Sequence, residues 1–418
     1  MGCLPIQLNA SGSSRMDNSV SRSTTRPNGS QRRWKLPTAI DSRQRFTVRL
    51  IVPRMKTALI TGVGGQDGSY LAELLLDQGY AVHGLVRRSS SLNRDRLDGL
   101  RAAAAARGLP FELHYGNLID PLGLQAVIGR VKPDEIYNLA SESHVGISFD
   151  EPEHSTSVNA VGVLRLLEIM RLTRPECRFY QASTSELFGG LVLRHREAGT
   201  GDPLATPSEA ARQPADYVCT ETSPFEPVSP YAIAKQYAHA MTAFYRRGYG
   251  LHASNGILFN HESPRRGFNF VTRKITATLA RLARGADELL LLGNLDSRRD
   301  WGYAADYVRA MWLMTMHDVA DDYVIATGQT HSVREFVERA AAVAGFQIVW
   351  EGSGPSETGY DRATGRRLVA VEPRFFRPLD HSSICGSAEK AKAVLGWRPT
   401  VSFDQLVEIM MTADLAQA

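Results

Sequence analysis

The chain has 418 residues, of which 43% are hydrophobic, and a formal net charge of +4. This size allows one large domain or two coupled domains. The four cysteines are scattered without a Cys-x-x-Cys pair, and no histidine cluster has zinc spacing, so we expect a reducing compartment, no disulfide framework and no bound metal. No apolar run approaches the ~20 residues that span a bilayer, and we therefore expect a cytoplasmic protein without a membrane partner.

The positive charge lies in the first part of the chain. Residues 1–54 carry ten Lys/Arg and two Asp, a net charge of +8, which leaves −4 for the remainder. The body therefore gives no indication of a nucleic-acid surface. This leader is rich in Ser, Arg and Asn and shows no hydrophobic period, which fits a disordered tail or an organelle presequence. We favour a third interpretation, a misassigned start, because Met55 leads directly into the first predicted strand.

From Thr57 onward, segments typical of strands and of helices alternate. Strands are predicted at Thr57–Thr61, Ala81–Val86, Phe111–Tyr115, Glu135–Ala140, Phe179–Ser183, His252–Phe259 and Tyr323–Thr327. Helical periods lie between most of them, for instance over Val158–Arg171 and Tyr231–Tyr249. This alternation predicts an α/β fold with a doubly wound parallel sheet of the Rossmann type.

Two regions interrupt the alternation. Leu191–Cys219 contains many Pro, Ala and Arg residues and is predicted to be a loop insertion. From Pro264 onward the chain is less regular, and only the strand at 323–327 returns to the sheet. We therefore expect residues 55–263 to form an NADP-binding Rossmann domain. Residues 264–418 should form mainly a smaller α/β substrate domain, which covers the ligand crevice of the sheet.

The first predicted strand ends in a glycine-rich turn. Gly62, Gly65 and Gly68 stand between this strand and the helix that follows. Glycine at these positions lets the backbone approach a pyrophosphate held at the helix N-terminus. A purely structural turn is the alternative interpretation.

The end of the second predicted strand indicates which dinucleotide binds. Arg87 and Arg88 follow this strand, then three serines, and no acid occurs before Asp95. In NAD-binding folds an acid near this point holds the ribose 2′-hydroxyl. Adjacent guanidinium groups and hydroxyls suit a 2′-phosphate instead, so the pattern predicts NADP. Two solvated surface arginines are the alternative.

Two later stretches carry acid and base groups. Ser229 is a plausible N-cap and Pro230 a natural first helical residue, so Tyr231 and Lys235 should lie one turn apart on one helix face. An ammonium near a phenol lowers the phenol's pKa from its usual value near ~10 and makes it a usable general base. Ser183-Thr184-Ser185-Glu186 adds a carboxylate, so one site could handle two separate protons. An inward aromatic and a solvated lysine remain the alternative.

Several longer strings are much more specific than the glycine turn. They are GQDGSYLAE at 65–73, FYQASTSEL at 179–187, NGILFNHESPRRG at 255–267, RDWG at 299–302 and PRFFRP at 373–378. With these strings the chain resembles the extended short-chain dehydrogenase/reductase superfamily, and within it the GDP-mannose 4,6-dehydratase family, from about Lys56 to Met411. The resemblance implies a seven-stranded sheet, NADP as cofactor and a homodimer or homotetramer. It also implies a lyase that converts GDP-mannose to GDP-4-dehydro-6-deoxy-mannose and water, the first step towards GDP-fucose- or GDP-rhamnose-type sugars.

The resemblance also implies roles for individual residues. Tyr231, assisted by Lys235, would take the proton of the sugar 4-hydroxyl, and Thr184 would hydrogen-bond the 4-oxygen. Glu186 would remove the C5 proton and protonate the departing 6-hydroxyl. The cofactor contacts are expected at Gly62, Val63, Gly64, Gly65, Gln66, Asp67, Gly68, Arg87, Arg88, Ser89, Ser90, Ser91, Asn117, Leu118, Leu139, Ala140, Ser141, Glu142, Ser143, His154, Tyr231, Lys235, His261 and Arg266. The substrate contacts are expected at Ser185, Asn260, Arg299, Arg374 and Arg377.

The chain departs from the family pattern at four positions near the expected cofactor. Gly64 and Asn117 stand where Thr and Asp are usual, Glu142 replaces a neutral residue, and His154 replaces a Tyr. The sequence leaves their effect on cofactor affinity open.

Three rival functions remain. A nucleotide-sugar 4-epimerase needs no acid at position 186, and a dTDP-glucose-type 4,6-dehydratase carries an Asp-Glu pair where this chain has Ser185-Glu186. A dinucleotide sensor without catalysis could lose its acid and base groups, whereas all of them are present here.

Overall fold

In the computed structural model, the described residues are 54–88, 95–191, 217–375 and 384–417, and they belong to one compact unit, Arg54–Ala418. The predicted leader, most of the Leu191–Cys219 insertion, Ser89–Ser91 and Arg377 lie outside the described residues. Across the described ranges, the structure contains no helix that is both long and apolar enough to cross a bilayer.

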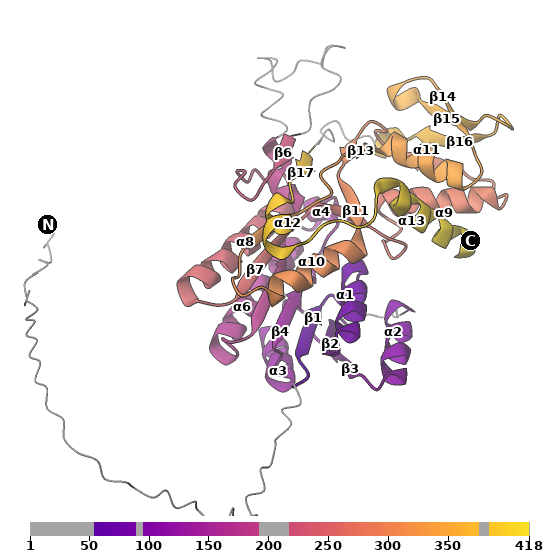
Figure 1. The fold of residues 1–418 in the computed structure, drawn as a ribbon. Helices are drawn as coiled ribbons and strands as arrows, with labels where there is room; N and C mark the ends of the chain where they lie inside the picture. The colour runs from indigo at the N-terminus through magenta and orange to yellow at the C-terminus, as the bar shows by residue number, and fades with distance from the viewer. Residues whose placement is uncertain (1–53, 89–94, 192–216, 376–383, 418) are drawn as a thin grey trace, which may run out of the picture. The chain divides into compact units, whose positions relative to one another are not determined.

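A parallel sheet of seven strands forms the centre of this unit (Figure 1). Its order is β12-β7-β5-β4-β1-β2-β3, and every neighbouring pair is parallel. The strands are β1 Thr57–Thr61, β2 Ala81–Val86, β3 Phe111–Tyr115, β4 Glu135–Asn138, β5 Arg178–Ala182, β7 Ala253–Leu258 and β12 Asp322–Ile325. All seven match strands predicted from the sequence, and the predicted doubly wound α/β fold is confirmed.

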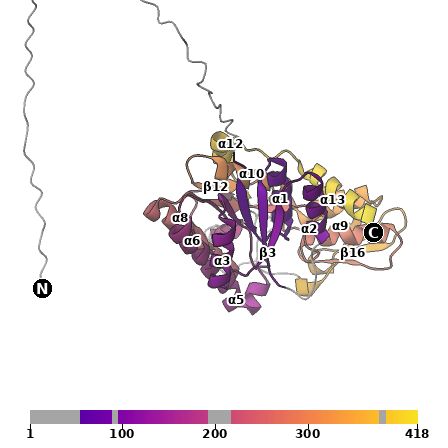
Figure 2. The same cartoon turned by 90° about the horizontal axis from the view of Figure 1, so that it is seen from below.

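Side chains alternate between the two faces of this sheet, and helices bury both. In β1, Ala58 and Ile60 pack into the core on one face, whereas Leu59 packs into the core on the other. One face is covered by α1 Gln66–Asp77, α2 Asp95–Ala106, α10 Ala304–Met316 and α12 Glu389–Leu395. The opposite face is covered by α3 Pro121–Val131, α6 Gly162–Thr173 and α8 Pro230–Tyr249 (Figure 2).

The predicted helix over Val158–Arg171 has an irregular start. It begins as one π-helical turn, η1 Ser157–Val161, and continues as α6. Two short helices, α4 Ile147–Asp150 and α5 Pro152–Thr156, lead into it. Single π turns of this kind often accompany functional sites, because they turn one residue away from the regular helix face.

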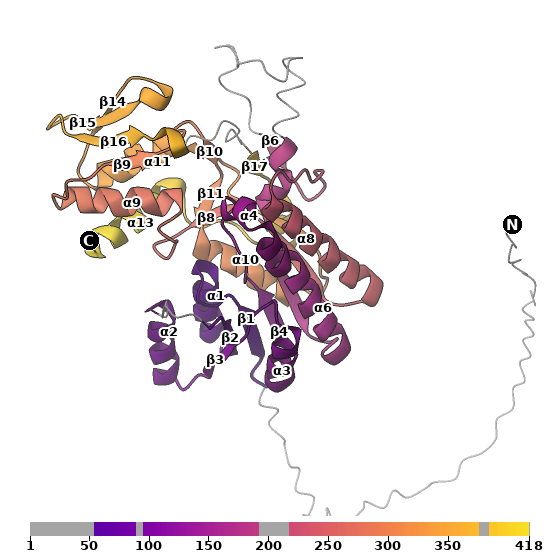
Figure 3. The same cartoon turned by 180° about the vertical axis from the view of Figure 1, so that it is seen from behind.

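A second core lies beyond the sheet's carboxyl edge. It contains the four-stranded sheet β14-β15-β16-β9, which is antiparallel except for the parallel pair β16–β9. The strands are β9 Leu290–Leu292, β14 Ile348–Glu351, β15 Thr358–Asp361 and β16 Arg367–Val371. Three helices pack against it, namely α9 Val271–Ala283, α11 Val333–Val343 and α13 Phe403–Gln417 (Figure 3).

Short elements connect the two cores. The two-stranded pairs are β8 Asn260–Glu262 with β11 Trp301–Tyr303, β10 Arg298–Arg299 with β13 His331–Ser332, and β6 Tyr217–Cys219 with β17 Ile384–Gly386. The 3₁₀ turns are η2 Ser185–Phe188, η4 Gly354–Ser356 and η5 Pro373–Phe375. Several of the expected substrate residues lie on these pieces.

The chain after residue 264 contributes helices to both cores, and not only to the second one. Tyr307 and Met311 of α10 are buried in the first core beside Trp397, whose indole donates to the Asp306 carbonyl oxygen at 2.8 Å. The reason is topological, since the connection from β7 to the parallel strand β12 needs a helix on one sheet face. The region predicted to form the smaller domain therefore also supplies α10 and α12, which pack on one face of the seven-stranded sheet.

Candidate active site

A cavity of about 1350 Å³ opens at the carboxyl ends of the parallel strands. Residues that follow β1, β4, β5 and β7 line one side of it, and residues from α9, β9, β10 and η5 line the other. Ligands of open parallel sheets bind at this edge, because the loops that follow the strands meet there. The cavity is therefore the candidate active site.

The glycine turn forms one end of the cavity. Gly62 has a φ of 70°, which favours glycine, and a Cβ added to Gly68 would lie 2.3 Å from the Gly62 carbonyl oxygen. Within the described residues, no side chain caps the N-terminus of α1, so its first backbone N–H groups are available to a ligand. The glycine backbone leaves room for a pyrophosphate group at the N-terminus of α1, and side chains at these positions would occupy that room.

A contact between distant parts of the chain holds the first turn of α1. His261 Nε2 lies 2.9 Å from an Asp67 carboxylate oxygen, and the Gln66 side chain donates to the His261 carbonyl oxygen at 3.0 Å. Burial raises the pKa of Asp67, but the charge and the hydrogen bond of His261, together with Gln66 and Arg266, outweigh it, so the pKa ends below its usual value. Burial lowers the pKa of His261, but the charge and the hydrogen bond of Asp67 raise it. The pKa of His261 ends above its usual value. The pair therefore favours its charged form and fixes the cofactor end of the cavity.

Arg87 and Arg88 lie at the cavity's rim beyond β2. Both side chains are exposed and line the cavity, and the Arg88 guanidinium lies 5.2 Å from the ring centroid of Tyr115. Stacking on an aromatic ring keeps a guanidinium in one plane while its N–H groups stay free for a phosphate. Arg96, from α2, joins this rim and donates to the Gly64 carbonyl oxygen at 3.1 Å.

The loop after β4 is held by a residue that the sequence analysis did not identify. Asn159, on the π turn η1, accepts from Ser141 Oγ at 2.8 Å and from the Glu142 backbone N–H at 3.1 Å. Its amide also donates to the Glu142 carbonyl oxygen at 3.0 Å. This amide fixes the loop's backbone whatever side chain occupies position 142, so the unusual Glu142 lies in an ordered loop.

Tyr231 and Lys235 are both buried at the centre of the cavity wall. Their relative exposures are 8% and 4%, and the Lys235 ammonium lies 5.8 Å from the Tyr231 ring centroid. Ser229 caps α8 by accepting from the Ala232 backbone N–H at 3.1 Å, as its sequence position predicted. The Tyr231 backbone N–H donates to Ser148 Oγ at 3.1 Å, which ties α8 to α4.

The protonation of this pair differs from the sequence-based expectation. Burial raises the pKa of Tyr231 to about 12, while hydrogen bonds with Thr184 and Ser141 lower it and the Glu186 charge raises it. Burial also lowers the pKa of Lys235 to about 8. The expected lowering of the phenol pKa by the ammonium is therefore wrong for the ligand-free site, because desolvation penalises both charged forms. The ammonium instead donates to the Ala182 carbonyl oxygen at 3.1 Å.

Thr184 and Glu186 lie beside the phenol. Thr184 caps the 3₁₀ turn η2, because its hydroxyl accepts from the Glu186 backbone N–H at 3.2 Å. Glu186 and Tyr231 line the same cavity, and the charge of the carboxylate raises the pKa of the phenol. One wall of the cavity thus contains a phenol, an ammonium, a hydroxyl and a carboxylate, which are groups for two different proton transfers.

The far end of the cavity is basic and aromatic. Arg299, Arg374 and Lys274 line it together with Phe375. The Lys274 ammonium lies 4.2 Å and the Arg374 guanidinium 4.9 Å from the Phe375 ring centroid. Burial and then the Arg374 charge lower the pKa of Lys274, while the Glu372 carboxylate, 3.8 Å from the Arg374 guanidinium, partly offsets them. Such a cluster suits a diphosphate.

The sequence profile of the GDP-mannose 4,6 dehydratase family matches residues 59–203 and 211–410. The chain belongs to the GDP-mannose 4,6-dehydratase family. The GDP-mannose 4,6-dehydratase of Sinorhizobium fredii is 49% identical over 363 residues, which cover 86% of this chain and 97% of that protein. The human GDP-mannose 4,6 dehydratase is 48% identical over 362 residues, which cover 86% of this chain and 91% of that protein.

Solved structures share the fold of this GDP-mannose 4,6-dehydratase family member. The UDP-glucose 4-epimerase of Thermotoga maritima has a TM-score of 0.66 at 22% identity and covers 86% of this chain and 98% of its own. The dTDP-glucose 4,6-dehydratase of Bacillus anthracis, solved with NAD, has a TM-score of 0.63 at 20% identity and covers 86% and 96%. At these identities the likeness shows the short-chain dehydrogenase/reductase architecture alone.

Nearly all residues that the family resemblance singled out line this one cavity. Among those in the described part of the chain, Val63 is the exception, since its side chain is buried in the first core. Four further residues of the site were not predicted from the sequence, namely Asn159, Ser148, Lys274 and Phe375. An asparagine or a serine inside a helical stretch gives no signal of its own, because its partner is known only from the fold.

Proposed function

We propose that this protein is a GDP-mannose 4,6-dehydratase that converts GDP-mannose to GDP-4-dehydro-6-deoxy-mannose and water. Membership of the family supports the activity, since the matched relatives carry this name and the chain covers almost their full length. The observation that carries the proposal is the pairing of Tyr231 with a separate carboxylate, Glu186, in one cavity. An alcohol oxidation alone needs a single base, whereas a dehydration also needs an acid and base at C5 and C6.

In the oxidation half, Tyr231 accepts the proton of the sugar 4-hydroxyl and Thr184 donates a hydrogen bond to the 4-oxygen. A bound dinucleotide would accept the hydride from C4 and later return it to C6. Because burial and the Glu186 charge raise the pKa of Tyr231 to about 12, the phenol needs added positive potential to act as a base. Lys235, one helical turn away, is proposed to add to that potential, although desolvation outweighs any effect of its ammonium on the phenol pKa.

In the elimination half, Glu186 removes the proton at C5, which the 4-ketone acidifies. The same carboxyl group then donates a proton to the 6-hydroxyl, which leaves as water. Glu186 therefore ends the elimination as a carboxylate, in its starting form. The addition of hydride at C6 requires one proton at C5, and the proton that Tyr231 took from the 4-hydroxyl accounts for it. The 4-ketone is kept in the product, and both residues end in their starting forms.

The product mass tests the reaction directly. Purified protein should convert GDP-mannose to a product lighter by one water, and it should leave dTDP-glucose unchanged. A product of equal mass would identify a 4-epimerase instead, and an unaltered substrate would favour a dinucleotide sensor. Turnover of dTDP-glucose at a similar rate would contradict the proposed nucleotide.

We also propose that NADP is the dinucleotide. The support is the absence of an acid at the end of β2 and the place of Arg87 and Arg88 on the cavity rim. Replacing both arginines by Gln should weaken NADP binding by about 10- to 100-fold, the scale of lost charge-assisted hydrogen bonds, and change NAD binding little. Arg107→Gln is the control, because Arg107 pairs with Asp77 outside the cavity. Preference of the wild type for NAD in a direct titration would contradict this assignment.

The basic far end of the cavity is proposed to bind the diphosphate and guanosine of the substrate. Arg299 and Arg374 were expected there, and Lys274 adds a third cation. The proposed division of labour follows from this arrangement. The loops of residues 55–263 hold the cofactor, and the region after residue 264 supplies most contacts to the nucleotide sugar.

A homodimer or homotetramer is proposed as the working assembly. Ile233, Tyr237 and Phe244 lie at helical spacing along α8, and all three are exposed. A row of exposed apolar side chains on one helix suits contact with a second copy of the chain. Light scattering at micromolar concentration should give at least twice the chain mass, and a monomer would count against the proposal.

A further inference from the structure

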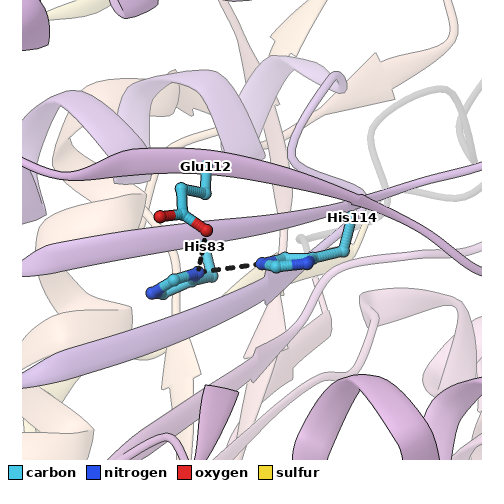
Figure 4. A group of neighbouring side chains, drawn as sticks. All are labelled: His83, Glu112 and His114. Carbon is cyan, nitrogen blue, oxygen red and sulfur yellow. Dashed lines mark hydrogen bonds and ion pairs between the residues drawn. The ribbon is translucent and has the colours of Figure 1, made fainter. Parts of the chain in front are cut away.

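Three potential metal ligands converge on the outer part of the sheet, outside the lining of the active-site cavity. His83 lies on β2, and Glu112 and His114 lie on β3, the last strand in the sheet order. The two strands pair in parallel with His83 opposite Glu112 and Leu85 opposite His114. Because side chains alternate along a strand, all three point to the same face, as Figure 4 shows.

The ligand atoms are close enough to share one ion. His83 Nδ1 lies 2.9 Å from His114 Nε2 and 3.8 Å from a Glu112 carboxylate oxygen, and one atom from each residue lies within 4.8 Å of the others. In a tetrahedral zinc site with bond lengths of about 2.0–2.2 Å, two ligand atoms lie about 3.3–3.6 Å apart. Side-chain adjustments of roughly 1 Å would therefore bring the three atoms around one cation.

The environment suits cation binding. Each imidazole can bind a cation through the lone pair of one ring nitrogen, and the two facing nitrogens, His83 Nδ1 and His114 Nε2, are already adjacent. The Glu112 side chain is 64% exposed and can turn towards the pair, and it supplies the negative charge. Arg130, at the end of α3, opposes that charge, because it lowers the pKa of His114 through space.

Without an ion, the two imidazoles can share one proton, and this hydrogen bond is the plain structural interpretation of the pair. A hydrogen bond between histidines does not require a carboxylate beside it. The carboxylate is what turns the pair into a set of three ligands of the kind that binds zinc.

We propose that His83, Glu112 and His114 form a site for a divalent transition-metal ion of the zinc class. Two nitrogen donors and one carboxylate favour such ions over Mg²⁺ and Ca²⁺, which prefer all-oxygen sites. Three protein ligands leave a fourth position open to water.

The site has a structural effect rather than a part in the sugar chemistry. In the described part of the chain, the cavity lining does not include any of the three ligands. A bound ion would join the edge strand β3 to β2, and β2 leads into Arg87 four residues beyond His83, about 13 Å along the strand. Occupancy would therefore stabilise the strand end that carries the rim arginines. The site also departs from the sequence-based expectation of no metal, because its ligands come from two strands.

Equilibrium dialysis of the full chain, stripped with a chelator and kept reduced, tests the site with Zn²⁺, Co²⁺ and Mg²⁺ as probes. One saturable Zn²⁺ per chain is expected, with visible absorption of tetrahedral strength for Co²⁺ and no competition by Mg²⁺. His114→Asn should weaken Zn²⁺ binding by at least about tenfold, and His317→Gln, a histidine outside the cluster, should leave it unchanged.

Glu112→Gln keeps the test decisive if His114→Asn fails to fold, because position 112 is exposed. Zn²⁺ should raise the thermal unfolding midpoint of the wild type and raise it less in Glu112→Gln. Equal Zn²⁺ affinity in the wild type and in these variants would overturn the proposal, as would the lack of a saturable site. Competition by Mg²⁺ at similar concentrations would overturn the assignment to the zinc class.

Discussion

At the level of single residues, burial decides the protonation of the site. Tyr231 and Lys235 lie one helical turn apart, yet desolvation moves their pKa values to about 12 and about 8, away from the form that each needs for base catalysis. The phenol is therefore neutral near pH 7, and the Lys235 ammonium loses its proton more readily than that of an ordinary lysine. Two predictions follow from the different duties of these groups.

The first separates the oxidation from the elimination. Tyr231→Phe removes the proposed base for the 4-hydroxyl, so hydride transfer should stop and bound cofactor should stay oxidised after substrate is added. Glu186→Gln keeps the size and the hydrogen-bonding capacity but loses the base, so water loss should fall by ~10²–10⁴-fold. Reduced cofactor should then accumulate in Glu186→Gln, visible as a slowly decaying absorbance.

Glu176→Gln is a suitable control, because Glu176 pairs with Arg174 outside the cavity. Water loss at the wild-type rate in Glu186→Gln would remove the carboxylate from the mechanism. It would also remove the main structural reason to prefer a dehydratase to an epimerase.

The second prediction concerns Lys235 and pH. Its folded pKa of about 8 lies below the ordinary value of 10.5, so between these values the unfolded chain binds more protons than the folded one. Stability should therefore rise as the pH rises through this window. Lys235→Met cannot titrate, so the stability of the wild type relative to this variant should increase by about 2 kcal/mol between pH 7.5 and 9.5. Urea unfolding of both proteins measures it, and a constant difference would mean that the lysine titrates normally.

At the level of elements, the turn after β1 requires glycine only where the backbone of another residue lies close. A Cβ on Gly68 would lie 2.6 Å from Val63 Cα, and backbone cannot yield without moving β1 or α1. A Cβ on Gly64 would meet only Leu97 Cδ1 at 3.7 Å. The family's usual threonine at position 64 thus has room near its Cβ, and glycine there is not required by packing.

The third prediction compares these two glycines. Gly68→Ala should lower stability by about 1–3 kcal/mol, the usual cost of overpacking, and should weaken dinucleotide binding in the same titration. Gly64→Ala should change stability by less than about 0.5 kcal/mol. Thermal unfolding and a cofactor titration on both variants check this, and equal effects at the two positions would show that the turn adjusts more freely than its contacts suggest.

At the level of the whole molecule, the compact unit begins at Arg54. The fourth prediction is that a chain beginning at Met55 folds and turns over GDP-mannose like the full chain. It would lose Arg54, whose ion pair with Asp134 at 3.3 Å lies at the surface and contributes little. Soluble yield, unfolding midpoint and turnover of the two chains measure the effect. A large loss of soluble protein would show that residues 1–54 take part in folding.

Two cores enclose the cavity from opposite sides, and one helix links them in sequence. The chain leaves the sheet after β7, builds α9 and β9 of the second core, and returns through α10 to reach β12. The rim arginines and the glycine turn follow strands of the seven-stranded sheet, whereas Lys274 lies on α9 and Arg374 on η5. A ligand that spans the cavity therefore contacts both.

The sequence by itself determined the features that depend on local pattern. Short apolar segments that alternate with helical periods predicted all seven strands of the parallel sheet, and Ser229 and Pro230 marked the start of α8 within one residue. Periodicity and capping act between near neighbours in the chain, so they can be recognised without coordinates. The long strings shared with the GDP-mannose 4,6-dehydratase family likewise sufficed to indicate the family.

Only the tertiary structure decided the features that depend on burial or on distant partners. It brings His261 to Asp67 across 194 residues, His83 to His114 across 31 residues, and Asn159 to the loop after β4. It also reverses the expected shift of the Tyr231 pKa, because the cost of desolvating a phenolate depends on everything packed around it. Spacing along a helix placed the two groups side by side, but only the fold fixed the dielectric environment in which they act.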